Sequence, residues 1–154
     1  MNKDIIKKIQ EQIIQLLPDN HQDRMDILLS DSCSEISRLI GGRIKIFDKS
    51  DHVLIIKGTN VCGTQKAHDI LMVTTANNQI YVIDPTIWQF FPQAKSILVS
   101  TSNNLNNALN KIRAIYGGQW SESEKIITMD ANEEKQYLDI ISRNIHENLK
   151  QLNQ

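Results

Sequence analysis

"AHDILMVTTANNQIYVIDPTIWQF", residues 67–90, holds the pattern that decides the fold. Two short runs rich in β-branched residues, DILMVTT and QIYVID, flank an Asn-Asn pair that favours a turn. The pattern predicts an antiparallel β-hairpin. His68 opens the first strand and Asp84 closes the second, and these two ends lie side by side in such a hairpin. We therefore predict that an imidazole and a carboxylate are neighbours there.

Apolar residues repeat at helical spacing on both sides of the hairpin. This spacing predicts an N-terminal helix over about residues 3–17 and a C-terminal helix over about residues 132–151. Residues 103–116 show the same period and are followed by two glycines, which commonly end helices.

A fourth helix is predicted from CSEISRLIGG, residues 33–42, with its end at the Gly-Gly pair. Asp31 and Ser32 are possible N-caps because their side chains can accept hydrogen bonds from the first turn. Cys33 would then lie in the first turn of this helix.

Four other segments have the β-branched composition of strands. They are RIKIF (43–47), HVLIIKG (52–58), KSILVST (95–101) and EKIITMD (124–130). No repeat or change of composition divides the chain. We predict one α+β domain over residues 1–154, with a core at about residues 30–100 and helices grouped first and last around a central antiparallel sheet.

Composition narrows the classes of function. A formal charge of −1 argues against a nucleic-acid or anionic-membrane surface, and no apolar run approaches the length of a membrane span. The N-terminus lacks the features of a secretory signal, so we expect synthesis in a reducing cytoplasm; delivery into another cell by a dedicated machine would leave no mark here. The two cysteines form no disulfide framework, and no metal-ligand spacing is present, so no cofactor is expected.

Cys33, His68 and Asp84 together suggest a thiol catalyst. A helix N-terminus stabilises a thiolate and supplies N–H donors to an oxyanion, while a histidine can take the thiol proton and a carboxylate can orient the histidine. Taken alone, Cys33 is also typical of a small core residue. Cys62 is a rival nucleophile six residues before His68, but it lies in a glycine-containing loop without a helix to activate it.

The motif HDILMV…QIYVIDPT resembles the His-strand, strand-Asp-Pro-Thr element of transglutaminase-like and papain-like cysteine enzymes. YVIDPTIWQF more narrowly resembles the papain-fold dermonecrotic toxin group, which includes bacterial effectors that deamidate glutamine in host proteins. The likeness covers roughly residues 30–92. It implies a papain-like fold with Cys33 as nucleophile, His68 as general base and then acid, and Asp84 as the orienting carboxylate.

Two residues after the aspartate complete the expected site. In the toxin group a glutamine five positions after the aspartate lies near the nucleophile, and Gln89 occupies that position. Its amide could donate to an oxyanion or hold the triad in place. Trp88 is expected to form core or pocket wall, with shielding of the substrate as a further role.

Such a triad supports deamidation, proteolysis or transglutamination, which differ in the carbonyl attacked and in the acceptor. The resemblance favours deamidation of an exposed glutamine in a protein substrate, which would be a host or competitor protein if the chain is an effector. Papain-like proteolysis and transglutamination stay open. A non-catalytic interaction module also stays open, with the apolar face of the first helix, Ile6, Ile9, Ile13 and Leu17, as its docking surface.

Overall fold

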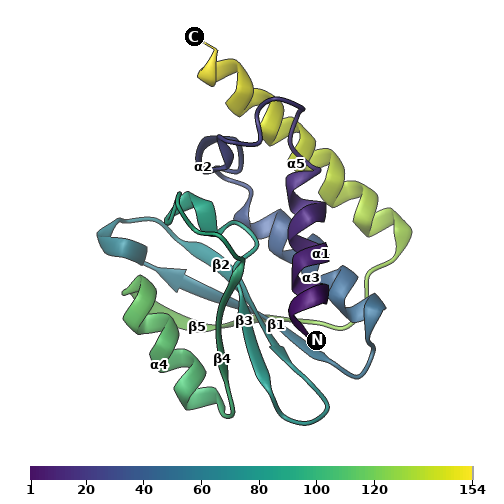
Figure 1. Cartoon of the computed structure of the whole chain (residues 1–154), viewed down its shortest axis with the longest axis vertical. Helices are drawn as coiled ribbons and strands as arrows, with labels where there is room; N and C mark the ends of the chain where they lie inside the picture. The colour runs from purple at the N-terminus through teal and green to yellow at the C-terminus, as the bar shows by residue number, and fades with distance from the viewer. Residues whose placement is uncertain (154) are drawn as a thin grey trace.

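The computed structural model describes residues 1–153 and contains a five-stranded antiparallel sheet with the spatial order β4-β3-β2-β1-β5 (Figure 1). The strands are β1 (His52–Thr59), β2 (His68–Thr74), β3 (Ile80–Ile83), β4 (Leu98–Ser102) and β5 (Gln119–Ile126). The helices are α1 (Lys3–Ile14), α2 (Met25–Leu28), α3 (Cys33–Phe47), α4 (Leu105–Tyr116) and α5 (Ala131–Leu152), with short 3-10 helices η1 (Val61–Gly63) and η2 (Ile87–Gln89). These elements confirm the α+β class and the predicted hairpin.

The sheet separates two buried clusters. Leu71 and Val73 of β2 point into the larger cluster, which contains the apolar faces of α1, α3 and α5. Ile70 and Met72 alternate to the other side and pack with α4. Figure 1 shows α4 on one side of the sheet and the other long helices on the opposite side. His68 has the same strand parity as Ile70, so its side chain belongs to the α4 side of the sheet.

The predicted helix end at Gly41–Gly42 and the predicted strand 43–47 are wrong, because α3 continues through the glycines to Phe47. The glycines serve close packing instead. A Cβ on Gly42 would lie 2.6 Å from Met129 Sδ, and a Cβ on Gly41 would overlap the side chain of Ile126. The absence of side chains at these two positions lets α3 lie close to the sheet edge and the following loop.

Helix α4 ends as predicted, with Gly117 at φ 66°. Two of its apolar residues, Leu105 and Ile115, are 50% and 43% exposed and lie outside the buried face. The residues that enter the core are Ala108, Ile112 and Tyr116. The buried face of α4 is thus rotated toward Tyr116.

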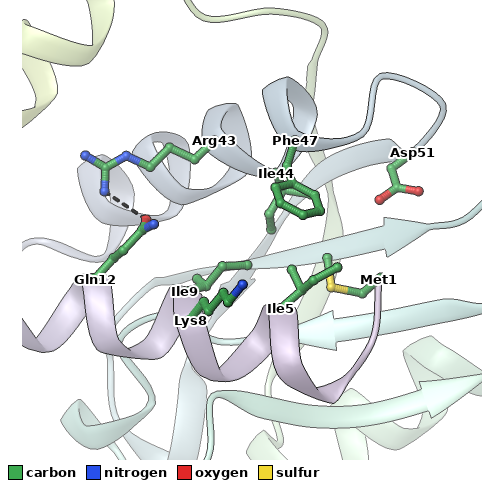
Figure 2. A pocket seen from close by; sticks show the side chains of 9 residues that line it. All are labelled: Met1, Ile5, Lys8, Ile9, Gln12, Arg43, Ile44, Phe47 and Asp51. Carbon is green, nitrogen blue, oxygen red and sulfur yellow. Dashed lines mark hydrogen bonds between the residues drawn. The ribbon is translucent and has the colours of Figure 1, made fainter.

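The apolar face of α1, proposed above as a docking surface, is buried in this chain's own core, with Ile13 fully inaccessible. A cavity of about 90 Å³ lies between α1 and α3 (Figure 2). At one end of it Arg43 donates to Gln12 at 3.2 Å, and at the other Phe47 is largely exposed. Within residues 1–153, none of the helices has the length and hydropathy needed to cross a membrane.

Candidate active site

His68 and Asp84 meet at the end of the hairpin, as predicted. His68 Nε2 and Asp84 Oδ2 are 2.8 Å apart, and both side chains are completely buried. Asp84 follows β3 directly, and its backbone N–H donates to the carbonyl of Ile97. The other carboxylate oxygen, Oδ1, accepts the backbone N–H of Thr86 at 3.1 Å. The turn after β3 therefore holds the carboxylate toward the imidazole.

Tyr116 is a third donor to Asp84. Its hydroxyl donates to Oδ2 at 2.6 Å, the same oxygen that bonds His68. Burial and the nearby Asp84 charge raise the pKa of Tyr116, so the phenol keeps its proton. Sequence reasoning missed this residue, because an aromatic at the end of an amphipathic helix looks like any other core residue.

The charge state of His68 follows from its partners. Burial by itself would lower the pKa of His68, but the charge and hydrogen bond of Asp84, with a smaller contribution from Cys33, raise it to about 10. The group is therefore an imidazolium at neutral pH. Asp84 occupies Nε2, whereas the buried Nδ1 has no hydrogen-bond partner among residues 1–153. Nδ1 is thus the nitrogen left to face the Cys33 thiol.

Cys33 is the first residue of α3 and is partly exposed. The first-turn N–H groups of a helix have no intrahelical acceptors, so they can bind an anion beside this thiol. The preceding loop is tied to α5, because Asn144 Nδ2 donates to the Asp31 carbonyl at 3.4 Å and to Ser32 Oγ at 3.3 Å. Ser32 is the N-cap residue, and Asp31 has a left-handed backbone (φ 64°). The loop thereby directs the chain into the helix that presents the thiol.

A pocket of about 280 Å³ opens beside the thiol. The side chains that line it include Asp26, Asp31, Cys33, Lys66, Gln89 and Phe90. The Phe90 ring also contacts His68 edge-on, with ring centroids 4.8 Å apart, and so covers the imidazole. The pocket therefore opens on the sulfur of Cys33, while the His68–Asp84 pair lies buried behind Phe90.

The side chains of Gln89 and Trp88 lie in different surroundings. Gln89 lines the pocket, and its side-chain amide donates to the carbonyl of Leu29 in the loop before α3. This bond links the segment after Asp84 to the loop that precedes Cys33. Trp88 is 3% exposed, lies in the α3-side core and donates through Nε1 to the Ala94 carbonyl at 2.8 Å. Its indole therefore packs in the core beneath the pocket-lining residues Gln89 and Phe90 and does not itself line the pocket.

Cys62 lies near the same network. It occupies η1 with a left-handed backbone (φ 53°) and is exposed. Burial of its sulfur and the charge of Asp84 raise the pKa of this thiol. A raised pKa lowers the thiolate fraction at neutral pH, so Cys62 is a poorer nucleophile than an ordinary solvent-exposed cysteine.

A second polar network joins the nucleophile helix to the histidine strand. Arg38 of α3 donates to Ser34 Oγ at 2.6 Å and to Asp69 Oδ2 at 3.1 Å. Ser37 Oγ donates to the backbone carbonyl of Asp69 at 3.1 Å. Ser34 and Asp69 are the residues directly after Cys33 and His68. This network, called the Arg38 clamp below, fixes the position of α3 relative to β2.

Within residues 1–153, no group of three His, Cys, Asp or Glu side chains is arranged to hold a metal ion. Comparison of the chain with protein-family models, curated proteins and solved structures finds no match.

Proposed function

We propose that this protein is a Cys-His-Asp acyl-transfer enzyme of papain-like fold, and that it deamidates glutamine in a protein substrate. The proposal rests on the buried 2.8 Å bond between His68 Nε2 and Asp84 Oδ2, beside a cysteine at a helix N-terminus. Nδ1 of the same ring has no hydrogen-bond partner within residues 1–153, and Cys33 is near enough to contribute to the raised pKa of the imidazole.

The first half of the reaction forms a thioester. The Cys33 thiolate attacks the δ-carbon of the glutamine side chain, and the carbonyl oxygen becomes an oxyanion that the first-turn N–H groups of α3 stabilise. His68 then gives its Nδ1 proton to the amide nitrogen. The C–N bond breaks, ammonia leaves, and a neutral imidazole remains.

The second half returns the enzyme to its starting state. Neutral His68 takes a proton from water at Nδ1, and the resulting hydroxide attacks the thioester carbon. The C–S bond breaks, glutamate leaves, and the thiolate–imidazolium pair is restored. Asp84 keeps its charge throughout and holds the ring in one orientation, as orienting carboxylates do in other triads.

The choice of deamidation draws on the resemblance of residues 81–90 to the deamidating toxin group and on the pocket beside Cys33. About 280 Å³ accommodates one side chain, and Gln89 at its wall offers an amide carbonyl and N–H of the kind a glutamine would bond. Proteolysis would need a backbone segment to reach the sulfur, and transglutamination would need an amine acceptor.

The test is intact-mass analysis with ammonia detection after incubation with a panel of purified glutamine-containing proteins such as casein. Wild type and Cys62→Ala are expected to add about 1 Da per modified glutamine and release ammonia, whereas Cys33→Ala does neither. Cleaved chains would instead assign a protease, and a larger adduct a transglutaminase.

Alkylation gives a reading that needs no substrate. Cys33 is expected to react with iodoacetamide faster than a free cysteine, because it lies at a helix N-terminus beside His68. The Cys62→Ala variant isolates this signal. A Cys33 that reacts no faster than a free thiol, in a protein silent on every substrate, would overturn the proposal.

A further inference from the structure

The hydroxyl of Tyr116 is placed where it acts on His68 through a shared oxygen. Asp84 Oδ2 accepts both the Tyr116 hydroxyl at 2.6 Å and His68 Nε2 at 2.8 Å. Tyr116 is 1% exposed, so no water takes the place of its hydroxyl. Asp84 cannot turn away from it without also giving up the backbone N–H of Thr86.

The ring of Tyr116 has little freedom to move. Phe91 packs edge-on to it with centroids 5.3 Å apart, and Trp120 lies at the same separation on the segment that follows. Trp120 is itself held by a 2.7 Å bond from its Nε1 to the Gly117 carbonyl, directly after Tyr116. The phenol is therefore a fixed donor aimed at Oδ2.

We propose that Tyr116 is a positioning residue for the triad, whose hydroxyl holds Asp84 Oδ2 in line with His68 and withdraws part of its negative charge, so that the imidazole gives up its proton during turnover. The catalytic part of this inference rests on the proposed function. The effect of Tyr116 on His68 does not, because it is a property of the resting protein.

The physical reason is competition for one oxygen. A neutral His68 leaves more negative charge on Asp84, so the bond from Tyr116 strengthens when the imidazole loses its proton. The groups that act on the imidazole charge are Asp84 after β3 and Cys33 on α3, while Cys62 of η1 acts electrostatically on both Asp84 and Tyr116. Asp84 and Cys33 favour the imidazolium, and Tyr116 opposes them through Asp84.

Turnover needs this opposition in the second half-reaction. The thioester carries no thiolate charge, so the contribution of Cys33 to the His68 pKa disappears once the acyl group is attached. Asp84 still favours the protonated ring, and Tyr116 reduces that preference. A neutral imidazole is the form that can accept a proton from water.

The experiment is an NMR titration of the histidines in Tyr116→Phe and in wild type between pH 5 and about 11, a range that covers the ordinary and the raised histidine pKa. His21, His52 and His146 serve as internal references, and His68→Gln assigns the fourth signal. Loss of the hydroxyl is expected to raise the His68 pKa by roughly 0.5. Tyr81→Phe, the same change on the α3 side of β3, is expected to leave it unchanged.

A second variant is expected to shift the His68 pKa in the opposite direction. It also keeps the hydroxyl of residue 116, so a shift in it cannot come from a cavity or a lost hydrogen bond. 3-Fluorotyrosine at position 116, incorporated in a Tyr81→Phe, Tyr137→Phe background, is a stronger donor and is expected to lower the His68 pKa. A His68 pKa that stays constant in both variants, or falls in Tyr116→Phe, overturns the inference.

Activity separates this inference from the proposed function. Tyr116→Phe should slow hydrolysis of the thioester roughly threefold while alkylation of Cys33 continues at the wild-type rate or faster. If the His68 pKa shifts in the Tyr116 variants but the wild-type protein shows no amidase activity, Tyr116 keeps its positioning role and the proposed deamidase function is rejected. If Cys33-dependent deamidation is found but the His68 pKa does not shift in the Tyr116 variants, only the inference about Tyr116 is rejected.

Discussion

Asp69 and Asp84 are two buried carboxylates near the same end of the sheet, and they have different kinds of partner. Asp84 is completely inaccessible and faces a histidine and a tyrosine, groups that can gain or lose a proton. Asp69 lies next to His68 in the chain, but its side chain turns to the α3 side and bonds Arg38, which is always charged. Arg38 is 21% exposed and also bonds the more exposed Glu124 at 2.8 Å.

The difference shows that two carboxylates at neighbouring strands serve two purposes. A carboxylate paired with an imidazole in a dry site sets how tightly a proton is held, so a change there alters chemistry. A carboxylate paired with a guanidinium holds no mobile proton, so a change there alters only position. Variants of the two networks should therefore separate catalysis from alignment.

The largest effect is expected from Asp84→Asn. An amide has one acceptor oxygen, so it cannot accept from Thr86 on one side and from His68 and Tyr116 on the other, and the charge that favours the imidazolium disappears. We expect kcat/KM for deamidation to fall by about a thousandfold or more, with a matching loss of Cys33 alkylation at pH 6. Near-normal rates would place the acid–base group elsewhere.

A pH dependence of stability is the next largest effect. The His68 pKa of about 10 exceeds the ordinary value of 6.5, so the folded state holds this proton more tightly than the unfolded chain. The stabilisation is complete below pH 6.5 and disappears as the pH rises to 10, with a slope of about 1.4 kcal/mol per pH unit at most. Urea denaturation of wild type across this range should show the loss, and His68→Gln should remove it.

Tyr116 extends the same titration. Its raised pKa keeps the phenol protonated in the fold, while an unfolded tyrosine ionises near pH 10. Above that pH the unfolded chain loses this proton first, so stability falls further. The Tyr116→Phe variant should lack this last part of the curve, and its loss of stability from His68 should extend to a slightly higher pH.

The Arg38 clamp should affect stability more than chemistry. Arg38→Met leaves the Asp69 carboxylate buried without its partner, which is expected to cost about 2 kcal/mol of unfolding free energy. Arg43→Met is the matched control, because Arg43 joins the same helix to Glu134 of α5, away from the thiol. Arg38→Met should slow alkylation of Cys33 severalfold and Arg43→Met should not; equal rates would remove the clamp from the site.

Ser37→Ala should have the smallest effect. The fully buried hydroxyl donates to the Asp69 carbonyl, and its loss should cost about 1 kcal/mol in urea denaturation. The alkylation rate should change less than twofold, because Arg38 still ties α3 to β2. A large drop in the rate would show that the clamp depends on Ser37 instead.

The local part of the site could be predicted from the sequence. His68 and Asp84 lie at the adjoining ends of one hairpin, whose β-branched runs and short turn set the register. Cys33 in a first helical turn followed from the apolar period after Ser32. Each of these predictions needed contacts only within a short stretch of chain.

The non-local parts could not be predicted in this way. Tyr116 reaches Asp84 from 32 residues further along, through the packing of α4 on the sheet. Gly41 and Gly42 read as a helix end, yet they accommodate side chains of β5 and the loop that follows it. Residues 43–47 have strand composition, and helix–sheet packing overrode that propensity.

The separation of the two clusters by the sheet also sets an order of assembly. A nascent chain that has emerged only as far as Asp84 contains Cys33, His68 and Asp84, but neither α4, which covers the His68 side of the sheet, nor β5, which pairs with β1. In such a chain His68 would be open to solvent, so we expect Cys33 to react as an ordinary thiol. Reactivity would arise only after synthesis has passed Tyr116, so the thiol remains latent on the ribosome until the fold is nearly complete.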